Sequence, residues 1–136
     1  MSDFVLTNAR VLGNDDFHTG HAVQVQDGKV AAVLPESALP AGLPRHDLGG
    51  GWLLPGFIDV QVNGGGGALL NNTPDVDALR AMMRGHRRYG TTGMLPTLIS
   101  DDAAVMEKAI AAVREAIADG VPGILGIHLE GPYIAP

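Results

Sequence analysis

The sequence predicts an α/β protein in which a small β-domain precedes parallel βα units. Two observations predict this class. Residues 1–53 contain short apolar runs separated by turn residues, whereas residues 54–136 alternate strand-like with helix-like segments. Strands that alternate with helices of this length favour parallel pairing through right-handed crossovers. We expect a β-sandwich-like domain over 1–53 and place the domain change near Trp52–Pro55.

Short strands and one strong turn are predicted in residues 1–53. Asp27-Gly28 stands between two alternating apolar runs, and an Asp-Gly pair in that position is a strong hairpin signal. A loop rich in Pro and Ala follows over 35–44, and His46–Leu48 then leads into three glycines. The predicted strands before that loop are Phe4–Leu6, Ala9–Leu12, His21–Gln26 and Val30–Leu34.

A β-α-β-α-β order is predicted for residues 54–136. The first helix opens at Thr73-Pro74, with Thr73 as the cap, and the second opens at Ser100; both close before a glycine. The predicted elements are strand Gly56–Asn63, helix Pro74–Tyr89, strand Thr92–Ile99, helix Asp101–Asp119 and strand Gly123–Glu130. Helical spacing predicts core faces made by Val76, Leu79, Met82 and Met83, and by Met106, Ile110, Val113 and Ile117.

The balance of charge argues against nucleic acid as a partner. The net charge is −6, whereas binding to phosphate backbones requires clustered cations. The basic cluster Arg80, Arg84, Arg87 and Arg88 lies in the second half of a predicted helix whose first turn is acidic. This order of charges complements the helix dipole, so we interpret the arginines as structural.

Any metal in this chain must be bound without cysteine. The sequence contains no Cys, which leaves His, Asp and Glu as ligands. No window approaches the ~20 apolar residues of a membrane span, so we expect a cytoplasmic protein with no membrane partner. His18, His21, His46 and His86 fall in the β-domain or on a helix, where surface or packing roles are expected.

Polar side chains gather toward the carboxyl ends of two predicted strands, where parallel α/β proteins hold their sites. In each strand the two-residue period separates an apolar face, which should meet the helices, from a face that becomes polar. Burying such groups unpaired costs about 1–3 kcal/mol each, so they need one another, water, a metal or a ligand. The apolar face of the first strand holds Ile58, Val60 and Val62, and the polar groups are Gln61, Asn63, His128 and Glu130.

Two interpretations of the four polar groups stay open. Any one of them alone is accounted for by hydrogen bonds to the others beneath a loop. Together, at matching strand ends, they favour a site, and the run Gly64–Gly67 would let the chain pass close to a bound group. The glycine run matches neither the P-loop nor the dinucleotide-binding fingerprint.

Two motifs resemble those of a known family. Leu54–Asp59 (LPGFID) with Val60–Gly64 (VQVNG) resembles the first barrel strand of the amidohydrolase superfamily, and His128–Tyr133 (HLEGPY) resembles the N-acetylglucosamine-6-phosphate deacetylases. The resemblance covers the whole chain. It implies a small β-domain followed, over 54–136, by the first three βα units of an incomplete (β/α)8 TIM-type barrel.

The resemblance implies hydrolysis of N-acetylglucosamine 6-phosphate to glucosamine 6-phosphate and acetate. It assigns Glu130 as a ligand of one divalent metal ion, zinc, which would acidify a water and polarise the amide carbonyl. Many superfamily members carry two metal-binding histidines where this sequence has Gln61 and Asn63, and amides are poor ligands for transition metals. We therefore expect one metal, with Gln61, Asn63 and His128 lining a pocket for substrate or water.

The resemblance also implies parts that lie beyond residue 136. The general-base Asp and two histidine ligands of the relatives come from later strands, so no catalytic residue is expected in this chain, which alone should be inactive. The complete protein is expected to be a homodimer. Two alternatives stay open: a structural piece that needs a complementary chain, and an amidohydrolase acting on another amide.

Overall fold

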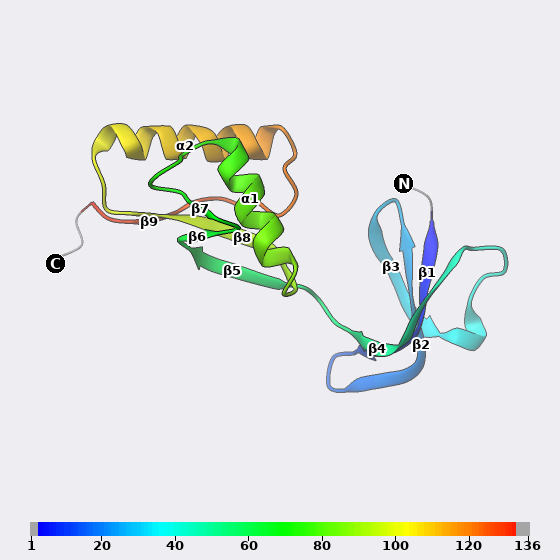
Figure 1. Cartoon of the computed structure of the whole chain (residues 1–136). Coiled ribbons are helices and arrows are strands. Elements are labelled where there is room, and N and C mark those ends of the chain that lie inside the picture. Colours follow the sequence, from blue (N-terminus) through cyan, green and yellow to red (C-terminus); the bar gives the residue numbers. More distant parts are fainter. Residues whose placement is uncertain (1–2, 133–136) are drawn as a thin grey trace. The chain divides into compact units, whose positions relative to one another are not determined.

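The chain divides into two compact units, residues 1–55 and 56–136. The computed structural model describes residues 3–132, so Tyr133 of the second motif lies outside the described residues. Figure 1 shows one unit made of strands and another that carries both long helices. The chain is thus an α/β protein with a β-rich N-terminal part, as its sequence predicts.

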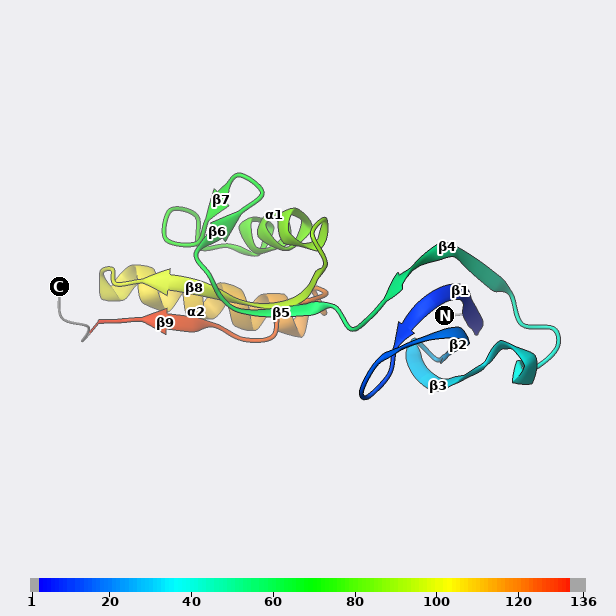
Figure 2. The same ribbon diagram turned by 90° about the horizontal axis from the view of Figure 1, so that it is seen from below.

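The first unit is a four-stranded sheet in the order β3-β2-β1-β4, seen in Figure 2. Strand β1 pairs antiparallel with β2 and parallel with β4. Small and β-branched side chains, among them Ala9, Val11 and Val23, form its core. The elements are β1 (Phe4–Leu12), β2 (Phe17–Gln26), β3 (Lys29–Pro35), the 3-10 turn η1 (Glu36–Ala38) and β4 (Arg45–Leu53).

Local turn chemistry explains where the predicted strands of this unit hold and where they differ. Asp27 and Gly28 both have positive φ, 49° and 75°, as a two-residue hairpin turn requires. The two strands predicted on either side of Asn8 are one strand, because a β-bulge with Asn8 at φ 53° absorbs the break. The glycines at 49–51 continue β4 instead of ending it.

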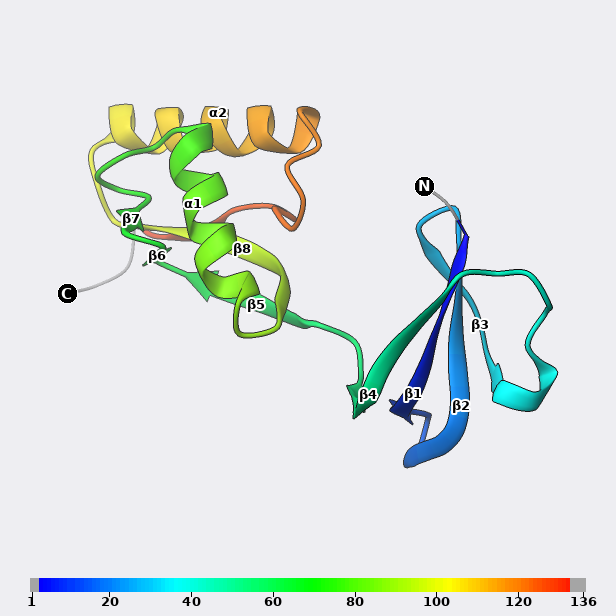
Figure 3. The same cartoon turned by 45° about the vertical axis from the view of Figure 1, so that its right-hand side comes forward.

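The second unit is a parallel sheet in the order β5-β8-β9 with both helices packed on one of its faces (Figure 3). Met94 and Leu98 of β8 are buried beneath the helices with Leu79 and Met82. The elements are β5 (Phe57–Val62), β6 (Gly64–Gly65), β7 (Ala68–Leu69), α1 (Val76–Arg87), β8 (Thr91–Ile99), α2 (Ala103–Ala118) and β9 (His128–Glu130).

Asp75, not Thr73, caps helix α1. The Asp75 carboxylate accepts a hydrogen bond from the Ala78 amide at 2.8 Å, and Asp75 itself has extended backbone angles. A carboxylate at this position satisfies an orphan amide and complements the positive end of the helix dipole. The helix therefore begins at Val76, two residues later than predicted.

The buried face of α2 differs from the predicted stripe. Ile117 is 47% exposed, whereas the fully buried residues are Val113 and three alanines, Ala109, Ala112 and Ala116. The buried face is thus rotated toward the side of the helix that carries the alanines. The predicted stripe holds for Val113 and for Met106, which packs against the core, and is wrong for Ile117. A search for large apolar side chains passes over the alanines.

The glycine run forms a small hairpin, β6–β7, that lies against α1. A Cβ on Gly65 would come within 2.5 Å of His86 Nε2, and one on Gly66 would overlap the Ala81 carbonyl oxygen. His86 Nε2 in turn lies 2.9 Å from the Gly64 carbonyl oxygen, and a carbonyl only accepts, so the ring donates. The glycines permit close approach to a helix, and their approach to a bound group stays a prediction.

Within residues 3–132, none of the helices has both the length and the apolar character that a membrane crossing requires.

Candidate active site

Strand β5 does not keep the simple alternation that its sequence predicts. Its pairing with β8 shifts register between Asp59 and Val62. Val62 is 3% exposed and belongs to the core under the helices, whereas Ile58 is 64% exposed. Ile58 is the register partner of Gly93 in β8. A Cβ built on Gly93 would lie 3.6 Å from Ile58 Cγ1, so the Ile58 side chain lies on the sheet face opposite the helices.

The register shift explains why one prediction for β5 is wrong. Ile58, Val60 and Val62 were expected to share a helix-facing side, but an irregularity of one residue moves part of a strand to the other face. The backbone amide of Gln61 donates a hydrogen bond to the Asp59 carboxylate at 3.1 Å within the irregular stretch. The polar end of β5 is therefore shaped by a bulge and not by a regular strand.

His128 joins β9 to β5 across the sheet. Its Nδ1 lies 2.9 Å from the Val60 carbonyl oxygen. A carbonyl oxygen has no proton to give, so Nδ1 carries the proton. In the neutral ring, Nε2 is then left as a hydrogen-bond acceptor. His128 is partly buried, and this hydrogen bond fixes the orientation of its ring.

Gln61 and Glu130 make a second connection between the same two strands. Gln61 Nε2 lies 3.5 Å from Glu130 Oε2, which is a long and weak hydrogen bond. Among residues 3–132 no ion pair engages Glu130, whose side chain is partly buried. Its carboxylate therefore keeps most of its capacity to accept a donor or a cation.

The structure brings three of the four predicted site residues together. Gln61 contacts Glu130 directly, and His128 contacts the backbone of Val60, the residue before Gln61. Asn63 is exposed, and its backbone carbonyl accepts from the Leu70 amide at 3.4 Å; within the described residues its side chain makes no hydrogen bond to the other three. The role of all four in binding stays a prediction.

Two residues that the sequence does not single out complete this end of the sheet. The Asn71 side chain hydrogen-bonds Ile99 and Asp101, and Ser100 Oγ donates to the Glu130 carbonyl oxygen at 2.8 Å. Asn71, followed by the backbone amide of Asp102, lowers the pKa of the Asp101 carboxyl. Asn71 carries no sequence signal beyond a polar residue near a predicted strand, and the sequence predicts Ser100 only as the opening of the second helix, which in the structure begins at Ala103.

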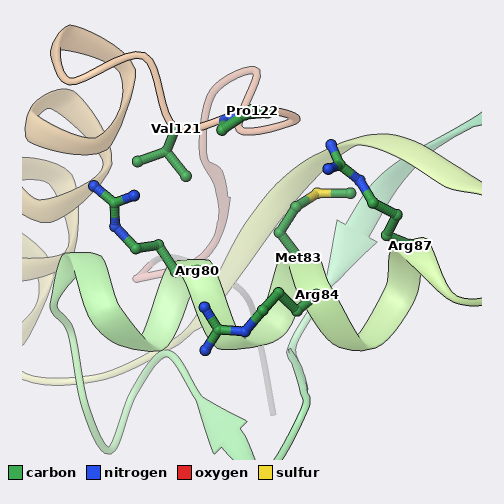
Figure 4. Close-up of a pocket in the computed structure, with 6 residues that line it drawn as sticks. All are labelled: Arg80, Met83, Arg84, Arg87, Val121 and Pro122. Atoms are coloured by element: carbon green, nitrogen blue, oxygen red, sulfur yellow. The ribbon is translucent and has the colours of Figure 1, made fainter.

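A separate hollow lies at the opposite ends of the strands. Figure 4 shows it between α1 and the segment Val121–Pro122, with the side chains of Arg80, Arg84 and Arg87 around it. Its volume is about 140 Å³. Arg80 lies 4.0 Å from Asp119, both partly solvent-exposed. Arg84 and Arg87 stand in the last turn of α1, where cations complement the helix dipole, which supports the structural interpretation of the arginines.

Known proteins match both units of the chain. Residues 4–53 match a family described as the NagA composite domain. The N-acetylgalactosamine-6-phosphate deacetylase of Shewanella sp. (strain ANA-3) is 45% identical over 98% of this chain. The N-acetylglucosamine-6-phosphate deacetylase of Haemophilus influenzae is 33% identical over 97% of it. The chain is a homologue of the amino-sugar-6-phosphate deacetylases.

Solved deacetylases carry the same fold over this region. The N-acetylglucosamine-6-phosphate deacetylase from Pasteurella multocida superimposes with a TM-score of 0.92 at 35% identity, covering 98% of this chain and 35% of that one. The enzyme from Mycobacterium smegmatis gives 0.80 at 28% identity, covering 99% and 34%. The chain covers 35% of each curated deacetylase named above, about a third of their length. The resemblance inferred from the two motifs is confirmed.

Proposed function

We propose that the protein carrying this chain hydrolyses the acetamide of N-acetylglucosamine 6-phosphate to give glucosamine 6-phosphate and acetate. The observation that carries the proposal is the convergence of Gln61, His128 and Glu130 at the carboxyl ends of β5 and β9, in a chain homologous to such deacetylases. The proposal includes residues 54–136 as the first three βα units of a (β/α)8 barrel, a fold whose active sites lie at the carboxyl ends of its strands.

Glu130 fits the role of a carboxylate ligand to one divalent metal ion, for which we propose zinc. Its only side-chain contact, with Gln61, is long, and it has no ion pair among residues 3–132. When bound, such a metal acidifies a water and polarises the amide carbonyl. No group of three His, Cys, Asp or Glu that could hold a metal occurs within residues 3–132. Two further ligands and the general-base Asp, which the resemblance implies, are proposed to come from later strands of the complete protein.

The neighbours of Glu130 have distinct parts in this proposal. Gln61 donates a long hydrogen bond to one carboxylate oxygen of Glu130. His128 holds the bulged backbone at Val60 and offers Nε2 to a donor, either a sugar hydroxyl or a water. Gln61 and Asn63 line the pocket as amides, which supports a single-metal site because amides are poor ligands for transition metals.

Metal content and acetate release, measured together on the complete protein, test the proposal. We expect about one equivalent of zinc per subunit and acetate release from N-acetylglucosamine 6-phosphate. Glu130→Gln preserves the shape of the side chain and should abolish both. The 136-residue polypeptide is expected to release no acetate. A folded, metal-loaded protein without deacetylase activity would contradict the assigned substrate and leave the fold assignment intact.

N-acetylgalactosamine 6-phosphate is a second candidate substrate. The relative named for that sugar is 45% identical to this chain, against 33% for a relative named for the glucosamine derivative. The two sugars differ only in configuration at C4. The ratio of kcat/KM values for the two phosphosugars on the complete protein decides between them, and unphosphorylated N-acetylglucosamine shows whether the phosphate is required.

The resemblance supports two further proposals about the complete protein, a homodimeric state and a cytoplasmic location. Sedimentation equilibrium tests the first, and a monomer at micromolar concentration would contradict it. Cell fractionation tests the second.

A further inference from the structure

We propose that Asn71 and Ser100 are positioning residues that hold the end of β9, and with it Glu130, in place. This inference rests on the proposed function only in taking Glu130 as the metal ligand. Both residues lie outside β5 and β9, in the connections that follow β7 and β8. Neither belongs to the hydrophobic core, and both bond backbone groups at strand ends, Asn71 through two hydrogen bonds to Ile99 and Ser100 through one to Glu130.

The Asn71 side chain bonds the backbone of Ile99 as a neighbouring strand would. Its Nδ2 donates to the Ile99 carbonyl at 3.0 Å, and its Oδ1 accepts from the Ile99 amide at 3.1 Å. A third bond, from Nδ2 to the Asp101 carboxylate at 2.8 Å, fixes which way the amide points. Both polar backbone groups of Ile99 are thus satisfied at the last residue of β8.

Ile99 transmits this support to the proposed ligand. It is the register partner of Glu130 in the pairing of β8 with β9. The following residue, Ser100, donates its hydroxyl to the Glu130 carbonyl oxygen at 2.8 Å. Asn71 therefore holds Ile99 from one side, while strand pairing and Ser100 tie β9 to the same segment.

Gly131 explains why this arrangement needs a glycine after the glutamate. Its φ is +125°, and a Cβ at this position would overlap Ser100 Oγ. The hydroxyl that holds Glu130 occupies the space that any side chain at 131 would need. The Glu-Gly step of the second motif is thus explained by contacts of the chain itself.

The support matters because the Glu130 side chain is weakly held by its own contacts. Its hydrogen bond with Gln61 is 3.5 Å long. Metal–ligand distances in proteins lie within about 0.2 Å of standard values, so a strand end that moves more than this is expected to weaken the metal site. Removing groups that orient a metal ligand typically costs about 10–100-fold in metal affinity.

The experiment compares Asn71→Ala and Ser100→Ala with Asn72→Ala in the complete protein. Asn72 is the matched control, since it is exposed and its side chain makes no hydrogen bond within residues 3–132. Zinc affinity is measured by competition with a chromophoric chelator. We expect about 10–100-fold weaker binding in both test variants and less than about a twofold change in the control. Ser100→Thr, which keeps the hydroxyl, should recover most of the affinity.

A second measurement keeps the inference independent of the metal. In the metal-free protein, amide hydrogen exchange of residues 128–130 should accelerate in Asn71→Ala and Ser100→Ala but not in Asn72→Ala. Unchanged exchange in both test variants overturns the inference, whether or not zinc binds. Accelerated exchange with unchanged zinc affinity also overturns it, because the strand end would then be irrelevant to the ligand. If the wild-type protein binds no zinc but amide exchange still accelerates in Asn71→Ala and Ser100→Ala, the two residues hold the end of β9 and the proposed function is wrong.

Discussion

Two adjacent glycines allow the close packing of the β6–β7 hairpin on α1 to be measured. Gly66 and Gly67 both have positive φ, +59° and +85°, so alanine is strained at either position. A Cβ on Gly66 would overlap the Ala81 carbonyl oxygen of α1, whereas a Cβ on Gly67 meets nothing within 4 Å. Gly66→Ala and Gly67→Ala therefore share the backbone strain and differ in the clash.

The expected effects follow from these two terms. A left-handed conformation costs a residue with a Cβ roughly 1–2 kcal/mol, which both variants lose. Forcing an atom into a packed contact costs typically a further 1–3 kcal/mol, which only Gly66→Ala loses. The partner of the clash is helix backbone and not the end of a flexible side chain, so the cost should fall in the upper part of that range.

The two units of the 136-residue polypeptide can be followed separately when it is unfolded in urea. Trp52 is the single tryptophan and belongs to the first unit, where its ring stacks edge-on against Phe17 at 4.5 Å. Both α-helices belong to the second unit, so far-ultraviolet circular dichroism at 222 nm reports mainly on it. With a urea m-value of about 1 kcal/mol/M, the circular-dichroism midpoint of Gly66→Ala should lie about 2–3 M below that of Gly67→Ala.

The Trp52 transition is the internal control, and its midpoint should be the same in both variants. Equal circular-dichroism midpoints for Gly66→Ala and Gly67→Ala would refute the packing of the hairpin against α1. Loss of helical signal in Gly66→Ala without denaturant, with Gly67→Ala still folded, would agree with it at the upper end of the expected cost.

Further perturbations test the core, a helix cap and a carboxylate. Leu79→Ala empties a fully buried site and should lower the stability of the second unit by about 2–5 kcal/mol in urea titrations. Asp75→Ala should cost about 1 kcal/mol by the same assay, and Asp102→Ala less, because Asp102 makes no side-chain capping bond. Hydrogen bonds from the Gly49 backbone amide and from the Asn8 side chain lower the pKa of the Asp47 carboxyl. Because the pKa of Asp47 is lower in the folded state than in the unfolded state, its contribution to stability is present above the unfolded pKa and is lost as pH falls through the folded pKa. The urea midpoint of the Trp52 transition should therefore fall below about pH 4, and it should fall less in Asp47→Asn.

Locally encoded features of the fold could be predicted from the sequence. The turn at Asp27-Gly28 was predictable because only a few residue pairs accept two positive φ angles in succession. The order of strands and helices in the second unit followed from hydrophobic periodicity and from glycines at the helix ends. The cap of α1 was misplaced by two residues because Thr73 and Asp75 are both good caps, and the entry of the chain into the helix decides between them.

The candidate site was predictable only in part. The polar ends of two strands indicated Gln61, His128 and Glu130, since parallel strands present their carboxyl ends at one edge. The contacts that Asn71 and Ser100 make depend on the paths of two connections, and no local pattern specifies those paths. The register shift in β5 also escaped the two-residue period, because a bulge shows its effect only against the neighbouring strand.

The sequence by itself determined the α/β class, the hairpin turn, the helices and the homology to amino-sugar-6-phosphate deacetylases, because each depends on neighbours along the chain or on short motifs. Only the tertiary structure decided which face each residue occupies and what the glycines serve. Gly65 and Gly66 serve a helix more than ten residues away, and Gly131 makes room for a hydroxyl from another strand end. Such roles arise from close approach in space, where the volume of one absent methyl group determines whether two distant segments can touch.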